Sequence, residues 1–350
     1  SCTWQSAFII TSSGKSVAIV GSLDVEGVKA TGLYEEVIGY VAGIKDTLIE
    51  VLNKYKPKKI AINTSKNDVM SDGLTHGCYE LLLEYLKDTG YADKFVSSEE
   101  IISALRGRKS PAEQKAVEEA VKLTEEIFQK LGKFIKTGLT EKQVAEFILK
   151  EVKTAGVEPA WDPTYCPSVF TGPESAGAHA GPTDRKIEPG HVLNIDFGVK
   201  KDGFCSDLQR TWYFLRKGEE DAPKEVKVAF KTIRDAIQLS AKNIMPGLPG
   251  YKADDIARNH IMSKGYEEYP HGLGHQVGRS THDGAGVLCP KWERYRDLPY
   301  MEVEEGQVYT LEPRITLKDY GVVTMEEIVV VTKNGTKFLS NPQKELYLVK

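Results

Sequence analysis

The chain has 350 residues, and its net charge of -4 comes from 46 Lys and Arg residues mixed with 50 Asp and Glu residues. This length favours two domains over a single core. The mixed, slightly acidic charge excludes the basic surface of a nucleic-acid-binding protein and the cationic face of a membrane-binding protein.

The chain also shows no signal for export or for a membrane span. No apolar run approaches the roughly 18 residues that cross a bilayer, and residues 1–16 lack the basic-then-apolar order of a signal peptide. The five cysteines are odd in number and scattered without CxxC spacing, which is typical of reduced thiols. The expected location is therefore the cytoplasm.

The first part of the chain predicts a small α/β domain. Strands are expected at residues 7–11, 16–22 and 58–64, and helices with apolar spacing at residues 42–56 and 77–88. The organisation changes near residue 105. We therefore expect an N-terminal domain at residues 1–105 and a second domain at residues 106–350.

Two helices with strong start signals open the second domain. Ser110, Pro111 and Glu113 provide an N-cap, a first-turn proline and a capping-box glutamate. The long amphipathic helix that they begin is expected to reach about Phe134, and a second helix with the same signal is expected to begin at Thr140. Both helices are expected to cover the outside of a sheet.

Residues 191–213 predict the first of two acidic hairpins, because two apolar, aromatic-rich runs flank a polar tetrapeptide with turn chemistry. The turn is expected to be centred between Lys201 and Asp202. That centre places Asp196 directly opposite Asp207, with Cβ atoms roughly 5 Å apart. Two carboxylates so close repel each other unless a cation lies between them. The hairpin therefore predicts part of a metal site.

A second acidic hairpin is expected at residues 308–332, where a turn centred on Asp319 pairs Glu312 with Glu326. Between the hairpins, the segment HGLGHQVGRSTHDG holds three histidines among glycines that let the backbone crowd a site, and His275 is the candidate nitrogen ligand. Four carboxylates and one imidazole suit a pair of divalent ions such as manganese, cobalt, iron or zinc.

Each of these features also has an ordinary structural interpretation. An aspartate at a strand end is usually a solvated cap, and a single histidine is usually a surface or core residue. Glu326 and Glu327 can form an exposed charged pair. Two mirrored acidic hairpins around a histidine- and glycine-rich segment favour the metal site over these interpretations.

The order of these residues resembles the metallopeptidase family that includes methionine aminopeptidase, Xaa-Pro aminopeptidase and Xaa-Pro dipeptidase (prolidase). The resemblance covers residues 105–350, and the preceding segment resembles the N-terminal domain of the proline-specific members. It implies an α+β protein, with a pita-bread catalytic domain and a smaller N-terminal α/β domain. That domain usually begins with a helix and a strand not found ahead of Trp4, so the chain is expected to start inside it.

The resemblance also implies roles for individual residues. The dinuclear metal ligands would be Asp196, Asp207, His275, Glu312 and Glu326. Glu312 would also pass a proton from water to the leaving nitrogen, and His179 and His282 would hold the substrate and stabilise the oxyanion. The alternative for these two histidines is that they only donate supporting hydrogen bonds. His271 matches the extra histidine of proline-specific members and would bind substrate.

The implied activity is that of a dinuclear-metal-dependent exopeptidase that removes the N-terminal residue from peptides with Pro second, like an Xaa-Pro aminopeptidase. Two divalent ions are expected, with manganese favoured, together with a peptide substrate and a homodimeric assembly. The alternative activity is that of an Xaa-Pro dipeptidase. A non-catalytic peptide-binding relative or a metal-free amidine hydrolase such as creatinase fits less well, because all five ligand positions hold ligating residues. Methionine aminopeptidase normally lacks the extra N-terminal domain.

The sequence constrains specificity less tightly. Prolidases resemble one another in an Arg two residues before the last Glu ligand, where a dipeptide carboxylate can be held, but this chain has Thr324 there. Longer peptides are therefore expected to be cleaved at least as well as dipeptides. Trp161 and Tyr165 are the expected apolar wall for the proline ring, with core packing as the alternative. A loop at residues 288–300 adds aromatic residues and arginines, either to the site or to a surface or dimer contact.

Overall fold

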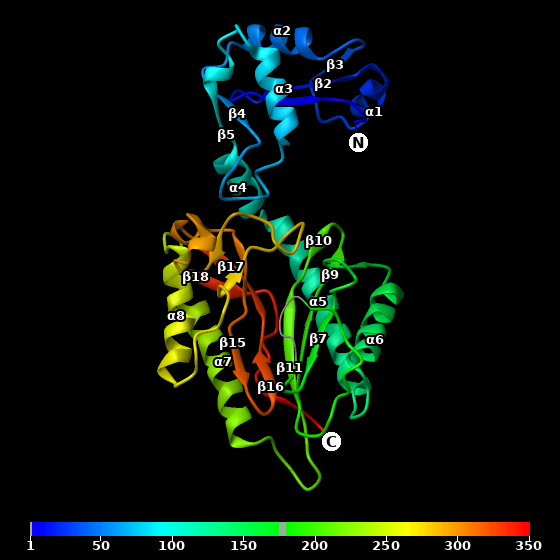
Figure 1. Ribbon diagram of the computed structural model, residues 1–350, viewed down its shortest axis with the longest axis vertical. Helices are drawn as coiled ribbons and strands as arrows, with labels where there is room; N and C mark the ends of the chain where they lie inside the picture. The colour runs from blue at the N-terminus through cyan, green and yellow to red at the C-terminus, as the bar shows by residue number, and fades with distance from the viewer. Residues whose placement is uncertain (1, 175–179) are drawn as a thin grey trace. The chain divides into compact units, whose positions relative to one another are not determined.

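The computed structural model describes residues 2–174 and 180–350, and the chain divides into two compact units. One unit holds Ser1–Ser65 and Asp72–Glu99, and the other holds Lys66–Ser71 and Glu100–Lys350. Helices and strands are mixed in both units, so the expected α+β class is confirmed (Figure 1).

The smaller unit combines short strands with helices near the predicted places. In one sheet β2 pairs antiparallel with β1 and parallel with β3, and in a separate sheet β4 pairs in parallel with β5. Val17 and Ile19 of β2 pack with Leu48 and Val51 of α2 in its core. The elements are β1 (Ala7–Ile10), β2 (Ser16–Gly21), η1 (Ser22–Asp24), α1 (Val25–Lys29), β3 (Glu36–Tyr40), α2 (Lys45–Tyr55), β4 (Ile60–Ile62), α3 (His76–Leu86), η2 (Ala92–Lys94) and β5 (Phe95–Ser97).

The helices of the larger unit begin where the capping signals predict. Ser110 and Thr140 each cap a helix in a capping box, so both predicted helix starts are confirmed. No helix in the described part of the chain is both long and apolar enough to cross a membrane. The helices are α4 (Glu99–Gly107), α5 (Pro111–Phe134), α6 (Glu141–Thr154), α7 (Lys224–Asn243), α8 (Gly250–Ser263), η3 (Glu293–Tyr295) and η4 (Leu298–Tyr300).

The strands of the larger unit form several small sheets. The main sheet has the order β19-β11-β8-β7, a second has the order β14-β17-β18, and β15 pairs with β16. The strands are β6 (Glu158–Pro159), β7 (Ser168–Thr171), β8 (Val192–Phe197), β9 (Val199–Lys201), β10 (Phe204–Cys205), β11 (Leu208–Phe214), β12 (Gly274–His275), β13 (Val287–Leu288), β14 (Val308–Leu311), β15 (Arg314–Leu317), β16 (Gly321–Thr324), β17 (Glu327–Thr332), β18 (Gly335–Phe338) and β19 (Tyr347–Val349).

Two apolar clusters hold the helices against these strands. In the first cluster α5 and α6 pack on β8 and β11, with Phe128 against Phe197 and Trp212. In the second cluster α7 and α8 pack on β14 to β17 through residues such as Ile233 and Val329. Figure 1 shows α5 and α6 beside the strands β7 to β11, and α7 and α8 beside β15 to β18. The prediction that α5 and α6 cover a sheet is thus confirmed.

The register of the first hairpin differs from the predicted one. β8 pairs with β11 so that Asp196 lies opposite Gln209, because the turn is centred between Asp202 and Gly203. Both turn residues have positive φ values, 51° and 81°, which suits the tight hairpin turn whose twist matches the strands. The prediction that Asp196 directly opposes Asp207 is therefore wrong. Asp207 precedes Gln209 by two residues, so it still faces the same side as Asp196.

The register of the second hairpin is the predicted one. Leu311 pairs with Glu327 in one ladder, and Arg314 pairs with Thr324 in the next. The two ladders have the same offset, so Glu312 stands opposite Glu326 in the interval between them, as the turn centred on Asp319 predicts.

Gly198, between β8 and β9, is required by close packing of the first hairpin. A Cβ atom there would lie 1.9 Å from the carbonyl oxygen of Ser206. We expect Gly198→Ala to lower the free energy of unfolding by about 1–3 kcal/mol, because a backbone shift must relieve this contact. Chemical denaturation checks the value.

The matched control is Gly132→Ala in α5, where the new Cβ would lie 3.9 Å from Nε1 of Trp212, an ordinary contact. That change should be neutral or stabilising, because Ala favours a helix more than Gly does. Equal losses in both variants would contradict the close contact at Gly198.

Candidate metal centre

Three strands place three polar side chains in one row. β8 and β11 pair Asp196 with Gln209, and an isolated bridge pairs Gln209 with Glu326. Residues that lie opposite each other on neighbouring strands share a face of the sheet. Asp207 precedes Gln209 by two residues, so its side chain lies on the same face. Glu312 stands opposite Glu326 and therefore also lies on this face. Pairing within each hairpin, together with the bridge between Gln209 and Glu326, thus gathers the four predicted carboxylates.

His275 enters from β12, which approaches the strand before Glu312 very closely. A Cβ atom on Gly274 would lie 1.9 Å from the carbonyl oxygen of Thr310, so only glycine permits this approach. The His275 N–H donates to Oγ1 of Thr310 at 3.1 Å. Its Nε2 lies 3.3 Å from Oε1 of Glu312 and 3.6 Å from Oδ2 of Asp207.

Asp207 and Glu326 are buried, Asp196 and Glu312 are half-buried, and the group has too few hydrogen-bond donors for its oxygen atoms. Oδ1 of Asp196, Oδ1 of Asp207 and Oε1 of Glu326 accept no hydrogen bond from the described residues. Burial raises the pKa of Asp196 to about 7 and that of Glu312 to about 8. Burial, and then the neighbouring carboxylates, raise the pKa values of Asp207 and Glu326 well above the usual range. Without a cation these groups would hold protons.

A divalent metal ion fits this set of ligands. One atom each from Asp207, His275 and Glu326 lie within 4.8 Å of one another, which suits a shared ion. Carboxylate oxygens and an imidazole nitrogen are ligands for manganese, iron, cobalt and zinc. The unpartnered oxygen atoms are the ones that such an ion would satisfy.

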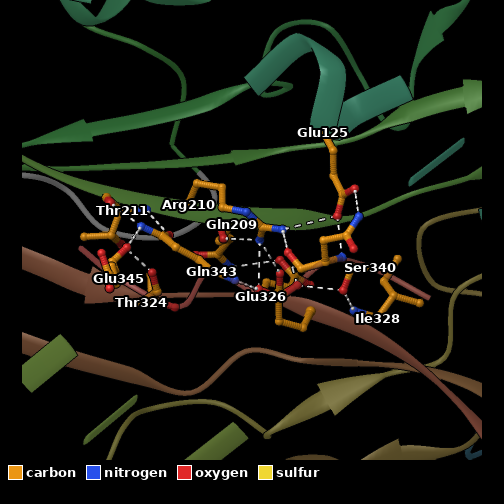
Figure 2. A network of polar contacts seen from close by, with 12 residues as sticks. Glu125, Gln209, Arg210, Thr211, Thr324, Glu326, Ile328, Ser340, Gln343 and Glu345 are labelled. Carbon is orange, nitrogen blue, oxygen red and sulfur yellow. Dashed lines mark hydrogen bonds and ion pairs between the residues drawn. The ribbon is translucent and has the colours of Figure 1, made fainter. Parts of the chain in front are cut away.

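A buried arginine holds the backbone behind these ligands, and the sequence analysis did not identify it. Nη1 of Arg210 donates to the carbonyl oxygens of Gln209 and Glu326 at 2.9 and 3.1 Å. The same atom lies 3.1 Å from Oε1 of Glu327 in an ion pair that is almost fully buried. Figure 2 shows Arg210 between the Gln209–Glu326 bridge and Glu125. A charged residue within the fully buried strand β11 was the available signal.

The side chain of Gln209 contacts a ligand directly. Its Nε2 donates to Oε2 of Glu326 at 3.0 Å, which leaves Oε1 of Glu326 without a partner. Glu327 is buried as well, where it accepts from Oγ of Ser340 at 2.6 Å and from the N–H of Gln343 at 2.9 Å. The interpretation of Glu326 and Glu327 as an exposed charged pair is therefore wrong.

Of the two predicted catalytic histidines, the structure describes His282 but not His179. The ring of His282 lies 4.1 Å from that of His275, centroid to centroid, so the two histidines lie side by side. The next residue, Asp283, is buried in an ion pair with Nζ of Lys109 at 3.3 Å, and it accepts from the N–H of Arg279 at 2.8 Å. These contacts fix the turn that carries His282. His179 lies outside the described residues.

The predicted substrate-binding residues surround the site less closely. Trp161 is partly buried against the first apolar cluster, and Tyr165 is 47% exposed. The Tyr295 hydroxyl accepts from the N–H of Gly272 at 3.1 Å, so the loop at residues 288–300 lies against the segment that carries His271. Burial lowers the pKa of His271 to about 4. The substrate roles of Trp161, Tyr165 and His271 stay predictions.

Comparisons with known proteins agree with this geometry. A model of metallopeptidase family M24 matches residues 115–333, well over half of the chain. The chain is 32% identical over 341 residues to an uncharacterized peptidase of Staphylococcus saprophyticus, covering 97% of this chain and 88% of that protein. It is 27% identical over 348 residues to an uncharacterized peptidase of Bacillus subtilis, covering 99% and 91%.

Solved structures are similar over nearly the whole chain. An Xaa-Pro dipeptidase from Bacillus anthracis has a TM-score of 0.80 at 24% identity, covering 99% of this chain and 90% of that chain. An X-Pro aminopeptidase from Thermotoga maritima has a TM-score of 0.74 at 25% identity, covering 96% and 88%. These similarities confirm the expected pita-bread fold.

The raised pKa values predict how pH affects the metal-free protein. Asp196 and Glu312 have ordinary pKa values of 3.8 and 4.5 and folded values of about 7 and 8. Between about pH 4 and 8 the folded chain therefore binds more protons at these groups than the unfolded chain does. The free energy of unfolding should fall as pH rises through this window. Denaturation at pH 5 and pH 8 in the presence of a chelator measures the change.

Saturating manganese should remove most of this loss at pH 8, because an ion that binds only the folded chain replaces the protons. The control is Asp196→Asn, which should flatten the pH dependence of the metal-free protein. A metal-free protein that becomes more stable from pH 5 to pH 8 would contradict the burial of these groups as carboxylic acids.

Proposed function

The chain belongs to metallopeptidase family M24, and from that premise we propose that it is an Xaa-Pro exopeptidase. It would remove the N-terminal residue from peptides that have Pro in the second position. The observation that carries the proposal is the set of carboxylates gathered beside His275, of which Asp207 and Glu326 are buried. Two similar structures, those of an Xaa-Pro dipeptidase and of an X-Pro aminopeptidase, support the choice of bond.

Two divalent ions are proposed for the site, with manganese favoured by the oxygen-rich ligands. The residues that would hold them are Asp196, Asp207, His275, Glu312 and Glu326. When bound, the ions would supply Lewis-acid activation of water and of the substrate carbonyl. The hydrogen bond from Gln209 would keep the Glu326 carboxylate in a fixed orientation.

Three residues would move protons and stabilise charge. Glu312 would take a proton from the attacking water and give it to the proline nitrogen as the amide bond breaks. His282, beside His275, would donate to the developing oxyanion, and His179 would hold the substrate. The proline ring offers no amide hydrogen, so an apolar wall that includes Trp161 and Tyr165 would recognise its shape.

Two rival interpretations differ from this one in measurable ways. A peptide-binding relative without catalysis would hold no metal, whereas the proposed hydrolase should bind about two ions per chain. An Xaa-Pro dipeptidase would require a free carboxylate on the proline, whereas an aminopeptidase would not. A homodimer and a cytoplasmic location remain part of the proposal.

The proposal predicts that Asp207→Asn abolishes hydrolysis of Xaa-Pro peptides while the chain stays folded. A neutral amide does not balance a cation, yet it nearly matches the shape of the acid. Hydrolysis and metal content are measured together after manganese is added, and the far-ultraviolet circular dichroism reports folding. Wild-type rates in the variant would refute Asp207 as a ligand. A metal-loaded wild-type protein that cleaves other peptides but no Xaa-Pro bond would refute the Xaa-Pro assignment.

A second prediction separates catalysis from metal binding. His282→Ala should lower kcat about 10²- to 10⁴-fold, the range for a lost proton donor or oxyanion donor. Metal content should stay near that of the wild type, because His282 is assigned no ligand role. His260→Ala on α8, away from the predicted site residues, is the control and should leave kcat unchanged. Loss of metal from His282→Ala would show that His282 is a ligand.

A further inference from the structure

A buried lysine contacts the turn at residues 276–283, which carries His282. Lys109 lies between α4 and α5, and its side chain is 2% exposed. Its Nζ donates to the carbonyl oxygen of Asp283 at 2.9 Å and to that of Arg106, and it lies 3.3 Å from Oδ2 of Asp283. One ammonium group therefore holds both the main chain and the side chain of the residue that follows His282.

The Asp283 carboxylate has further contacts that fix it in place. Its Oδ2 accepts from the N–H of Arg279 at 2.8 Å, and its Oδ1 forms an ion pair with Nη2 of Arg106. A Cβ atom on Gly278 would lie 2.2 Å from Oδ2 of Asp283 and 2.4 Å from Cε of Lys109. The turn is therefore packed as well as hydrogen-bonded against this buried pair.

The turn joins the two neighbouring histidines, His275 and His282. The N–H of Asp283 donates to the carbonyl oxygen of Gln276 at 2.9 Å, so the residues that directly follow the two histidines meet at the base of the turn. The histidine rings lie side by side, with centroids 4.1 Å apart. The separation of the rings therefore depends on how firmly Asp283 is held, and Lys109 holds it from outside the turn.

Stability alone is a weak reason for a charged pair at this place. Apolar side chains of similar size often stabilise a fold as much as a buried ion pair does, because burial removes hydration from the charges. Burial lowers the pKa of Lys109, which is the direction that such a loss of hydration causes. A charged, hydrogen-bonded pair does fix one geometry, since its donors and acceptors need defined positions. The pair is therefore suited to holding the adjacent residue in place.

We propose that Lys109 is a positioning residue for catalysis, which acts through Asp283 to keep His282 beside His275. This inference rests on the proposed function, because it requires the role in hydrolysis that is assigned to His282. Lys109 precedes Asp283 by 174 residues, so the fold alone brings the two together. A displacement of about 1 Å at a catalytic group can cost about 10²-fold in rate. Loss of Lys109 should therefore lower turnover, although Lys109 is assigned no contact with the substrate.

Lys109→Met tests the proposal on manganese-loaded protein, because Met nearly keeps the length of the side chain and removes its charge. With Ala-Pro-Ala as the substrate, kcat should fall about 10- to 100-fold, while KM changes less than about threefold. Metal content should stay near that of the wild type. Lys115→Met, the same change at an exposed position of α5, is the matched control and should behave like the wild type.

A double-mutant cycle separates positioning from a general structural role. In the His282→Ala background, Lys109→Met should lower kcat by less than a further threefold or so, because the group that it positions is already gone. Equal losses with and without the His282 side chain would overturn the inference. Loss of metal from Lys109→Met would also overturn it, and so would a kcat close to that of the wild type.

Hydrogen exchange gives a readout that depends neither on turnover nor on bound metal. In the presence of a chelator, amides of residues 276–283 should exchange at least about tenfold faster in Lys109→Met than in the wild type or in Lys115→Met. Unchanged exchange would overturn the inference. If the wild type cleaves no Xaa-Pro peptide but exchange changes as expected, the proposed function fails while the hold of Lys109 on the turn stands.

A second variant keeps the test decisive if Lys109→Met does not fold. Asp283→Asn removes the charge but keeps an acceptor for the N–H of Arg279. It should reproduce the loss of kcat and the faster exchange of the turn. Wild-type kcat in folded Asp283→Asn would overturn the inference. Failure of both variants to fold would show a purely structural role for the pair and would overturn it as well.

Discussion

The repulsion among four carboxylates held close together is the constraint on which the larger unit depends. Asp207 and Glu326 are buried, Asp196 and Glu312 are half-buried, and loss of hydration raises the pKa values of all four. Such a group persists in a folded protein only when cations or protons balance it. The two hairpins hold the four groups in place. Because Gly274 has no side chain, its strand can pack close enough to bring His275 beside them. The site is therefore positioned by the pairing of the strands in which the ligands lie or which flank them.

Ion pairs behind the ligands keep this arrangement rigid. Arg210 binds the carbonyl oxygens of the bridge between Gln209 and Glu326, and Glu327 holds the other side of Arg210 (Figure 2). The buried pair of Lys109 and Asp283 does the same for the turn that carries His282. Removing one partner of such a buried pair would leave an uncompensated charge, which is strongly destabilising. Metal ligands and the groups beside them thus have positions fixed by charge as well as by packing.

The sequence by itself determined the local features. Helix starts at Ser110 and Thr140, the register of the second hairpin, the α+β class and the resemblance to a metallopeptidase family all follow from short-range signals such as capping boxes and turn residues. The first hairpin was predicted with its turn one residue too early, but the alternation of side chains kept Asp207 on the face of Asp196. Only the tertiary structure decided which distant groups meet. The bridge of Gln209 to Glu326 and the burial of Glu327 against Arg210 depend on contacts between strands far apart in the chain. No local pattern records such contacts, because their energy comes from neighbours that the fold alone brings together.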